Sequence, residues 1–246
     1  MDNNLMALAI IPGLLILGYV YGKDKVEKEP LSMIIKIVFF GAASCLVAGT
    51  AEAALQSVLP QYERGTIQFA LQTSFCLAAF CEETVKYIAL RIGSWRSRYF
   101  NYRFDGIVYA VSSAVGFAVF ENIQYVAMYG IGTAITRAFL AVPLHAFCGV
   151  FMGVFYSYSK KAAIVGEGGV SAACTLLALI VPMIIHGVYD TCAFMGTQAF
   201  TYMLLGFVVL LYIAAISTIR KMSAEDRDAG FYPEARVIEY DTTLTE

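Results

Sequence analysis

Three ionisable side chains, Glu82, Glu83 and Lys86, lie within one helical turn inside an apolar stretch that runs from Thr66 to Ile92. A charged group near the middle of a bilayer costs about 2.5–3.5 kcal/mol, so such groups are usually paired and functional. At helical spacing Lys86 lies four residues from one glutamate and three from the other, where it offsets their negative charges. The triplet can then keep one carboxylate as a general base and the other as its structural partner. A buried interhelical ion-pair network is the simpler alternative.

Further polar groups occur inside other apolar stretches, and both histidines of the chain are among them. His186 and Asp190 share a helix face at a spacing of four residues, which lets a carboxylate orient an imidazole. Lone buried histidines are commonly structural. Here both histidines of the chain lie in apolar stretches beside several carboxylates, and this favours a functional site. The candidate site residues are Glu82, Glu83, Lys86, Glu121, Asn122, His145, His186 and Asp190.

Four other charged residues lie near the ends of apolar stretches, and we interpret them as groups that reach the membrane surface: Lys36, Glu52, Asp105 and Arg137. Prolines precede both histidines, Pro143 by two residues and Pro182 by four. Because proline removes a backbone hydrogen bond, we expect a kink near each histidine.

The composition is that of a membrane protein. Of 246 residues, 59% are hydrophobic and only 15% are charged, against about 25% in soluble domains. The net charge of −2 argues against nucleic acid as a partner. We predict an all-α polytopic membrane protein of about seven spans, since a span needs about 20 apolar residues. The expected spans are Leu5–Gly22, Leu31–Leu59, Thr66–Ile92, Phe104–Tyr129, Thr133–Tyr158, Gly169–Met195 and Ala199–Ile219.

Basic residues favour the cytoplasmic side of alternate loops, and this rule predicts the orientation. Thirteen of the seventeen lysine and arginine residues fall on the cytoplasmic side if the N-terminus is outside and the C-terminus is cytoplasmic. We expect one transmembrane domain over residues 1–219, with a catalytic core of about 66–195. Residues 220–246 are rich in charged side chains, and this composition predicts a cytoplasmic, disordered tail.

Small residues recur on two of the expected spans and predict close helix packing. They are Gly106, Ala110, Ala114 and Ala118 on one span, and Gly149 and Gly153 on the next. Counted at about 1.5 Å per residue, the polar groups of four spans lie at similar depths, in the central-to-outer layer of the membrane. A cavity opening outward would supply them with water.

Four motifs in order make the chain resemble the PrsW family of intramembrane proteases, and more distantly the CAAX-prenyl endopeptidase superfamily. They are Glu82-Glu83-Thr-Val-Lys86, Phe117-Ala-Val-Phe-Glu121-Asn122, the isolated His145, and His186-Gly-Val-Tyr-Asp190. The wider superfamily tends to have His at the position of Glu121 and Asn at that of Asp190. The resemblance implies hydrolysis of a peptide bond in a membrane-anchored protein substrate, such as an anti-sigma factor, in a bacterial cell membrane. It also implies a site-1-type step of regulated proteolysis.

Two mechanisms stay open at this stage. In one, Glu121, His145 and His186 bind a zinc ion, and Glu83 or Glu82 deprotonates the water, with Glu83 the preferred base. In the other no metal binds, a glutamate activates water directly, and a histidine with Asn122 or Asp190 polarises the carbonyl.

Two other functions use the same residues. A proton-coupled transporter or carrier could be built on the buried Glu, His, Asp and Lys groups, although no inverted repeat is visible. A catalytically inactive scaffold that binds membrane helices is the third hypothesis.

Overall fold

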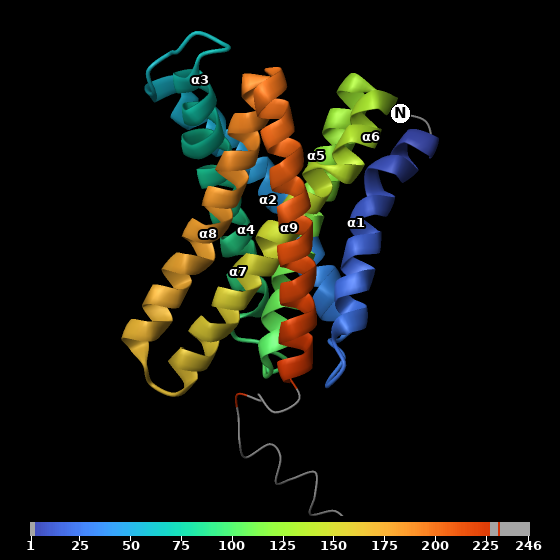
Figure 1. Cartoon of the computed structure of the whole chain (residues 1–246). Helices are drawn as coiled ribbons and strands as arrows, with labels where there is room; N and C mark the ends of the chain where they lie inside the picture. The colour runs from blue at the N-terminus through green and yellow to red at the C-terminus, as the bar shows by residue number, and fades with distance from the viewer. Residues whose placement is uncertain (1–2, 227–230, 232–246) are drawn as a thin grey trace, which may run out of the picture.

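The computed structural model describes residues 3–226 and 231, and all the regular secondary structure in this part of the chain is helical (Figure 1). Within these residues, six helical stretches are long and apolar enough to cross a membrane, the fourth of them made of two consecutive helices: Asn3–Lys23, Leu31–Val58, Arg103–Tyr129, Ile131–Ile164, Gly168–Met195 and Gln198–Glu225. Each corresponds to a segment expected from the sequence. The N-terminal end of α1 (Asn3–Lys23) and the C-terminal end of α9 (Gln198–Glu225) lie at opposite ends of the bundle (Figure 1).

The expected segment that contains Glu82 and Glu83 is helical throughout but is not a regular α-helix. Three elements follow one another without a break: α3 (Ile67–Leu71), the π-helix η1 (Gln72–Ala79) and α4 (Phe80–Ser94). Phe75 of η1 lies against Gly187, where an added Cβ would be 2.4 Å from the ring. The wider π turn is of the kind found at functional sites, and it ends at Ala79, three residues before Glu82.

The central helix of the bundle is α5 (Arg103–Tyr129), which is buried from Phe104 through Ala118. It packs most extensively on α7 (Ala141–Ile164) and on α2 (Leu31–Val58). Small residues allow both contacts. A Cβ at Gly153 would lie 2.5 Å from the Cα of Ile107, and one at Gly116 would lie 2.1 Å from the carbonyl oxygen of Val38. The predicted small-residue packing between the fourth and fifth expected segments is thus confirmed.

The fifth expected segment, Thr133–Tyr158, lies within the candidate span Ile131–Ile164 and is divided into two helices close to the kink expected near His145. Helix α6 (Ile131–Phe139) ends before Leu140, and α7 begins at Ala141. Pro143 lies in the first turn of α7, where its missing N–H breaks no hydrogen bond of that helix. The carbonyl of Phe139, which Pro143 cannot bond, accepts a hydrogen bond from the Tyr212 hydroxyl at 3.2 Å.

The remaining boundaries differ little from those expected. Helix α8 (Gly168–Met195) runs through Pro182 without ending there. Helix α9 continues to Glu225, beyond the expected end at Ile219. The rest of the expected disordered tail, apart from Asp226 and Phe231, lies outside the described residues.

Candidate active site

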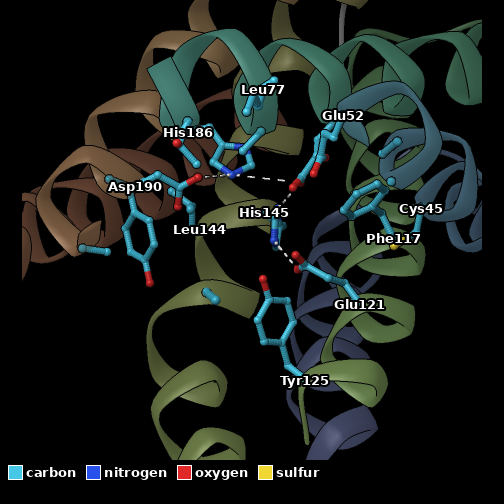
Figure 2. A pocket seen from close by; sticks show the side chains of 18 of the residues that line it. Cys45, Glu52, Leu77, Phe117, Glu121, Tyr125, Leu144, His145, His186 and Asp190 are labelled. Atoms are coloured by element: carbon cyan, nitrogen blue, oxygen red, sulfur yellow. Dashed lines mark hydrogen bonds and ion pairs between the residues drawn. The ribbon is translucent and has the colours of Figure 1, made fainter. Parts of the chain in front are cut away.

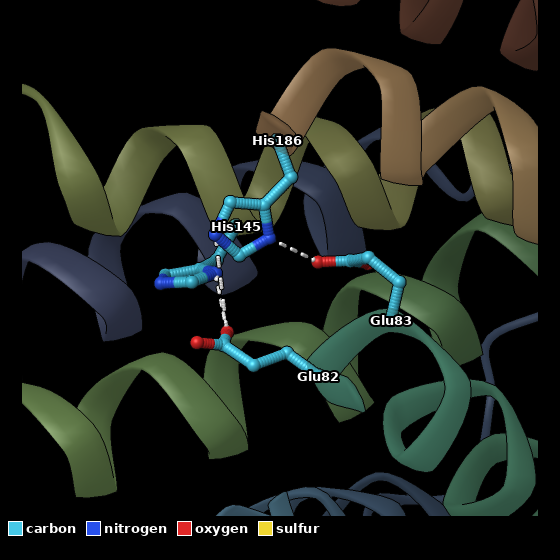
Figure 3. Close-up of side chains that lie close together, drawn as sticks. All are labelled: Glu82, Glu83, His145 and His186. Atoms are coloured by element: carbon cyan, nitrogen blue, oxygen red, sulfur yellow. Dashed lines mark hydrogen bonds and ion pairs between the residues drawn. The ribbon is translucent and has the colours of Figure 1, made fainter. Parts of the chain in front are cut away.

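Four of the predicted site residues come together where α4, α7 and α8 meet (Figure 3). Glu82 and Glu83 lie in the first turn of α4, directly after the π-helix, while His145 and His186 come from α7 and α8. One ligand atom of each lies within 4.8 Å of the others, and all four side chains are buried. Glu83 is fully enclosed, and Glu82 is 6% exposed.

Lys86 lies among these residues and is completely buried. Its ammonium donates to Glu82 Oε2 at 3.0 Å and to Glu83 Oε1 at 2.8 Å, as the spacing predicts. It also lies 3.0 Å from His145 Nδ1 and 4.1 Å from the centre of the Phe117 ring. One lysine therefore offsets two carboxylates whose mutual repulsion would otherwise be severe in so dry an environment.

The partners of His145 fix its tautomer. An ammonium group only donates hydrogen bonds, so His145 Nδ1 must accept the one from Lys86. The proton of the neutral ring is then on Nε2, which lies 3.0 Å from Glu121 Oε2 and donates to it. His145 thus connects Lys86 to Glu121 through its two nitrogens.

His186 is held by carboxylates on both sides, Asp190 (Figure 2) and Glu83 (Figure 3). Its Nδ1 lies 2.8 Å from Glu83 Oε1, and its Nε2 lies 3.3 Å from Asp190 Oδ2. The expected His-Asp contact at four-residue spacing is present. Contacts of this kind orient imidazole ligands in metal sites and histidine bases in metal-free ones.

Arg137 is a member of this network that the sequence analysis missed. Its Nη2 lies 2.5 Å from Glu121 Oε2, and its Nε donates to Asn122 Oδ1 at 2.9 Å. Asn122 in turn donates to the Ala9 carbonyl of α1 at 2.9 Å. The interpretation of Arg137 as a group that reaches the membrane surface is therefore wrong. Its short helix α6 is strongly amphipathic, with Thr133, Thr136 and Arg137 at helical spacing, and this pattern was the available signal.

A partly open cavity of about 700 Å³ borders the cluster (Figure 2). Its walls include Glu82, Glu121, His145, His186 and Asp190, whereas Glu83 is not among them. Glu52, which we expected at the membrane surface, also lines it. The cavity lies between the C-terminal halves of α2, α5 and α8, next to α6. It is therefore in the half of the bundle that contains the start of α1 (Figure 1).

The geometry also bears on two preferences from the sequence, the choice of base and the choice of metal ligands. Glu83 was the preferred base, but Glu82 is the glutamate of the pair that faces the cavity and any water in it. The expected metal set was Glu121, His145 and His186. The atoms that converge instead belong to Glu82, Glu83 and the two histidines, while Glu121 is engaged by Arg137.

The donor set fits a zinc ion. Two imidazoles and two carboxylates are the nitrogen and oxygen donors that catalytic zinc takes. Glu83 Oε2 is buried without a hydrogen-bond partner in the described part of the chain, so it has capacity to bind a cation. The ammonium of Lys86 contacts Glu82 Oε2, Glu83 Oε1 and His145 Nδ1, so an ion bound by these atoms would displace the lysine from them.

The arrangement is of the hydrolytic class: a carboxylate facing a cavity within a membrane-spanning bundle, with two oriented imidazoles beside it. Comparison with known proteins agrees. A family model described as PrsW family intramembrane metalloprotease matches residues 29–216. The chain therefore belongs to the PrsW family of intramembrane metalloproteases, which are integral membrane enzymes that hydrolyse peptide bonds.

Curated relatives match along nearly their whole length. Protease PrsW of Bacillus subtilis strain 168 is 31% identical over 217 residues, covering 88% of this chain and 94% of the relative. Protease PrsW of Geobacillus kaustophilus strain HTA426 is 30% identical, covering 94% and 97%. That of Clostridioides difficile strain 630 is 27% identical, covering 94% and 96%. No solved structure matches this chain.

Proposed function

We propose that this chain cleaves a peptide bond of a membrane-anchored protein at the cluster formed by Glu82, His145 and His186. The observation that carries the proposal is that these three side chains line one cavity inside the helical bundle. The cavity gives water and an extended peptide access to polar groups that are otherwise surrounded by apolar helices.

The proposed topology has seven spans, with the N-terminus outside and the C-terminus cytoplasmic. The seventh span is the continuous helical stretch Ile67–Ser94, and an odd number of crossings agrees with the start of α1 and the end of α9 at opposite ends of the bundle (Figure 1). The cavity then opens toward the outer side, in the half that holds the start of α1. A site there suits a substrate whose anchor is cut near its outer end, such as an anti-sigma factor in a site-1-type step.

Glu82 acts as the general base in this proposal because it is the cavity-facing member of the pair. Lys86, 3.0 Å away, offsets its charge and fixes the direction in which the carboxylate points. Glu83 has a different role. It is enclosed, and it orients His186 through the 2.8 Å contact to Nδ1.

His145 and His186, together with a carboxylate oxygen of the Glu82–Glu83 pair, would hold the zinc ion that the family description implies, each histidine through a ring nitrogen that would exchange its present partner for the ion. Such an ion supplies a Lewis acid that polarises the scissile carbonyl and makes nearby water more acidic. Asp190 restrains His186 from the cavity side, and Glu121 restrains His145 through Nε2. Arg137 keeps Glu121 in position and balances its charge.

The test is cleavage of a single-span substrate in proteoliposomes, with the products mapped by mass spectrometry. Wild type is expected to cut near the outer end of the substrate's span and to contain one zinc ion per chain by elemental analysis. His186→Ala should lose both the cleavage and the zinc, while Glu63→Gln, in the loop before α3, should lose neither. Normal cleavage by folded His186→Ala would refute the proposal. Solute-coupled proton uptake without cleavage by wild type would instead support a carrier.

A further inference from the structure

A second cluster of acidic side chains lies at the end of the bundle opposite the half with the cavity (Figure 1). Asp24 and Glu29 belong to the loop between α1 and α2, Asp105 lies in the first turn of α5, and Asp226 follows α9. All four are buried, with exposed fractions of 1% to 2%. Buried carboxylates are costly unless hydrogen bonds, a counter-charge or a metal ion compensates them.

Only some of the carboxylate oxygens of these four residues accept a hydrogen bond. Asp105 Oδ2 accepts from the backbone N–H groups of Asn101 and Tyr102, at 2.9 and 2.6 Å. Glu29 Oε2 accepts from the Tyr109 hydroxyl. Asp226 Oδ1 accepts from the Phe104 N–H at 3.1 Å.

Four buried oxygens are left without a hydrogen-bond partner in the described residues: both of Asp24, Oδ1 of Asp105 and Oδ2 of Asp226. Asp24 is the decisive member because it is 1% exposed and neither of its oxygens makes a hydrogen bond. Its carboxylate is nevertheless directed into the cluster. One oxygen each of Asp24, Glu29 and Asp105 lies within 4.8 Å of the others, and Asp226 repels both aspartates.

Neighbouring basic groups offset this charge only in part, Lys28 at Asp24 and Arg103 at Asp226. Lys28 has the largest opposing effect on Asp24, but it is exposed, and its ammonium donates to the Tyr21 carbonyl at 2.5 Å. Burial raises the pKa of Asp24 to about 6 and that of Glu29 to about 7, which reflects the cost of the uncompensated anions.

We propose that Asp24, Glu29 and Asp105 form a binding site for a hard divalent cation of the Mg²⁺ or Ca²⁺ type, with Asp226 at its edge. A set of oxygen donors only, without imidazole or thiolate, selects hard cations rather than zinc. The cation ties the loop after α1 to the start of α5, next to the end of α9. It is separate from the histidine-containing cluster and does not depend on the proposed function.

The experiment measures Mn²⁺, as a paramagnetic probe, bound to the full chain in detergent after removal of metals with EDTA. Free Mn²⁺ is followed by electron paramagnetic resonance, and Mg²⁺ is added in a parallel thermal-unfolding series. Wild type is expected to bind Mn²⁺ and to unfold at a higher temperature with Mg²⁺. Asp24→Asn should bind at least about tenfold more weakly and lose the Mg²⁺ effect. Glu27→Gln, an exposed change of equal charge in the same loop, should behave as wild type.

Two further variants keep the outcomes distinct. His145→Ala, which alters the other cluster, should retain Mn²⁺ binding at this site. Glu29→Gln should reduce Mn²⁺ binding as Asp24→Asn does. It replaces Asp24→Asn in the test if Asp24→Asn does not fold. The proposal is overturned if Asp24→Asn binds Mn²⁺ as tightly as wild type, or if no Mn²⁺ binding remains in His145→Ala. A lower unfolding temperature of Asp24→Asn in EDTA would also contradict it, because Asp24 would then already have a partner.

Discussion

Replacement of Lys86 by methionine removes the positive charge at the centre of the site while preserving most of the side-chain volume. Lys86 lies 3.0 Å from Glu82 and 2.8 Å from Glu83, and its side chain is 1% exposed. At an effective dielectric constant of about 20, each contact is worth about 6 kcal/mol of attraction, much of which offsets desolvation. The net cost of removing one member of such a buried group is about 3–5 kcal/mol, because the remaining charges stay buried and unpaired.

The assay is reversible unfolding of the purified protein in mixed micelles as the fraction of denaturing detergent is increased. Lys86→Met is expected to lower the free energy of unfolding by about 3–5 kcal/mol. Adding Glu83→Gln should recover part of this loss, since the double variant carries one carboxylate fewer. Lys25→Met, the same substitution at an exposed position in the loop after α1, should change stability by less than about 0.5 kcal/mol.

The reasoning fails if Lys86→Met costs less than about 1 kcal/mol, the value of an exposed pair. It also fails if the double variant is no more stable than Lys86→Met. Either result would mean that the glutamates are not held as a charged pair around Lys86.

Two other predictions concern the groups around the site. Arg137→Lys is expected to reduce cleavage without abolishing it, measured as turnover of a single-span substrate, because an ammonium cannot reproduce the guanidinium fork that holds Glu121; unchanged turnover would exclude the positioning role. Gly116→Ala should lower the unfolding temperature strongly, since its Cβ would lie 2.1 Å from the Val38 carbonyl, whereas Gly18→Ala, with open space around it, should be neutral or slightly stabilising. Equal effects of the two glycine changes would contradict the close packing of α2 and α5.

The seven helical segments follow from the sequence because each is a long apolar stretch bounded by polar or charged residues. The interruption at Leu140 does not. Pro143 indicates that one backbone hydrogen bond is lost. The position of the break also depends on Tyr212 of another helix, whose hydroxyl donates to the carbonyl of Phe139. The π-helix before Glu82 is likewise set by tertiary packing, notably that of Phe75 on Gly187.

The membership of the site was largely predictable, because an ionisable residue within an apolar segment is costly to bury and is usually retained for function. The roles of these residues were less accessible. Helical spacing places Lys86 near both glutamates, but it does not show which glutamate faces the cavity, because this depends on how α4 is rotated against α7 and α8. Arg137 was missed because a charge near the end of an apolar segment usually reaches water, and only the packing of α6 turns it toward Glu121.

The most direct test of the account is the single-turnover cleavage rate of Glu82→Gln in proteoliposomes. The substitution preserves shape and removes the proposed base, so the rate is predicted to fall by about 10²–10⁴-fold. Glu63→Gln, the matched exposed control, should cleave as wild type does. Cleavage by folded Glu82→Gln at the wild-type rate would contradict the assignment of this cluster as the hydrolytic centre.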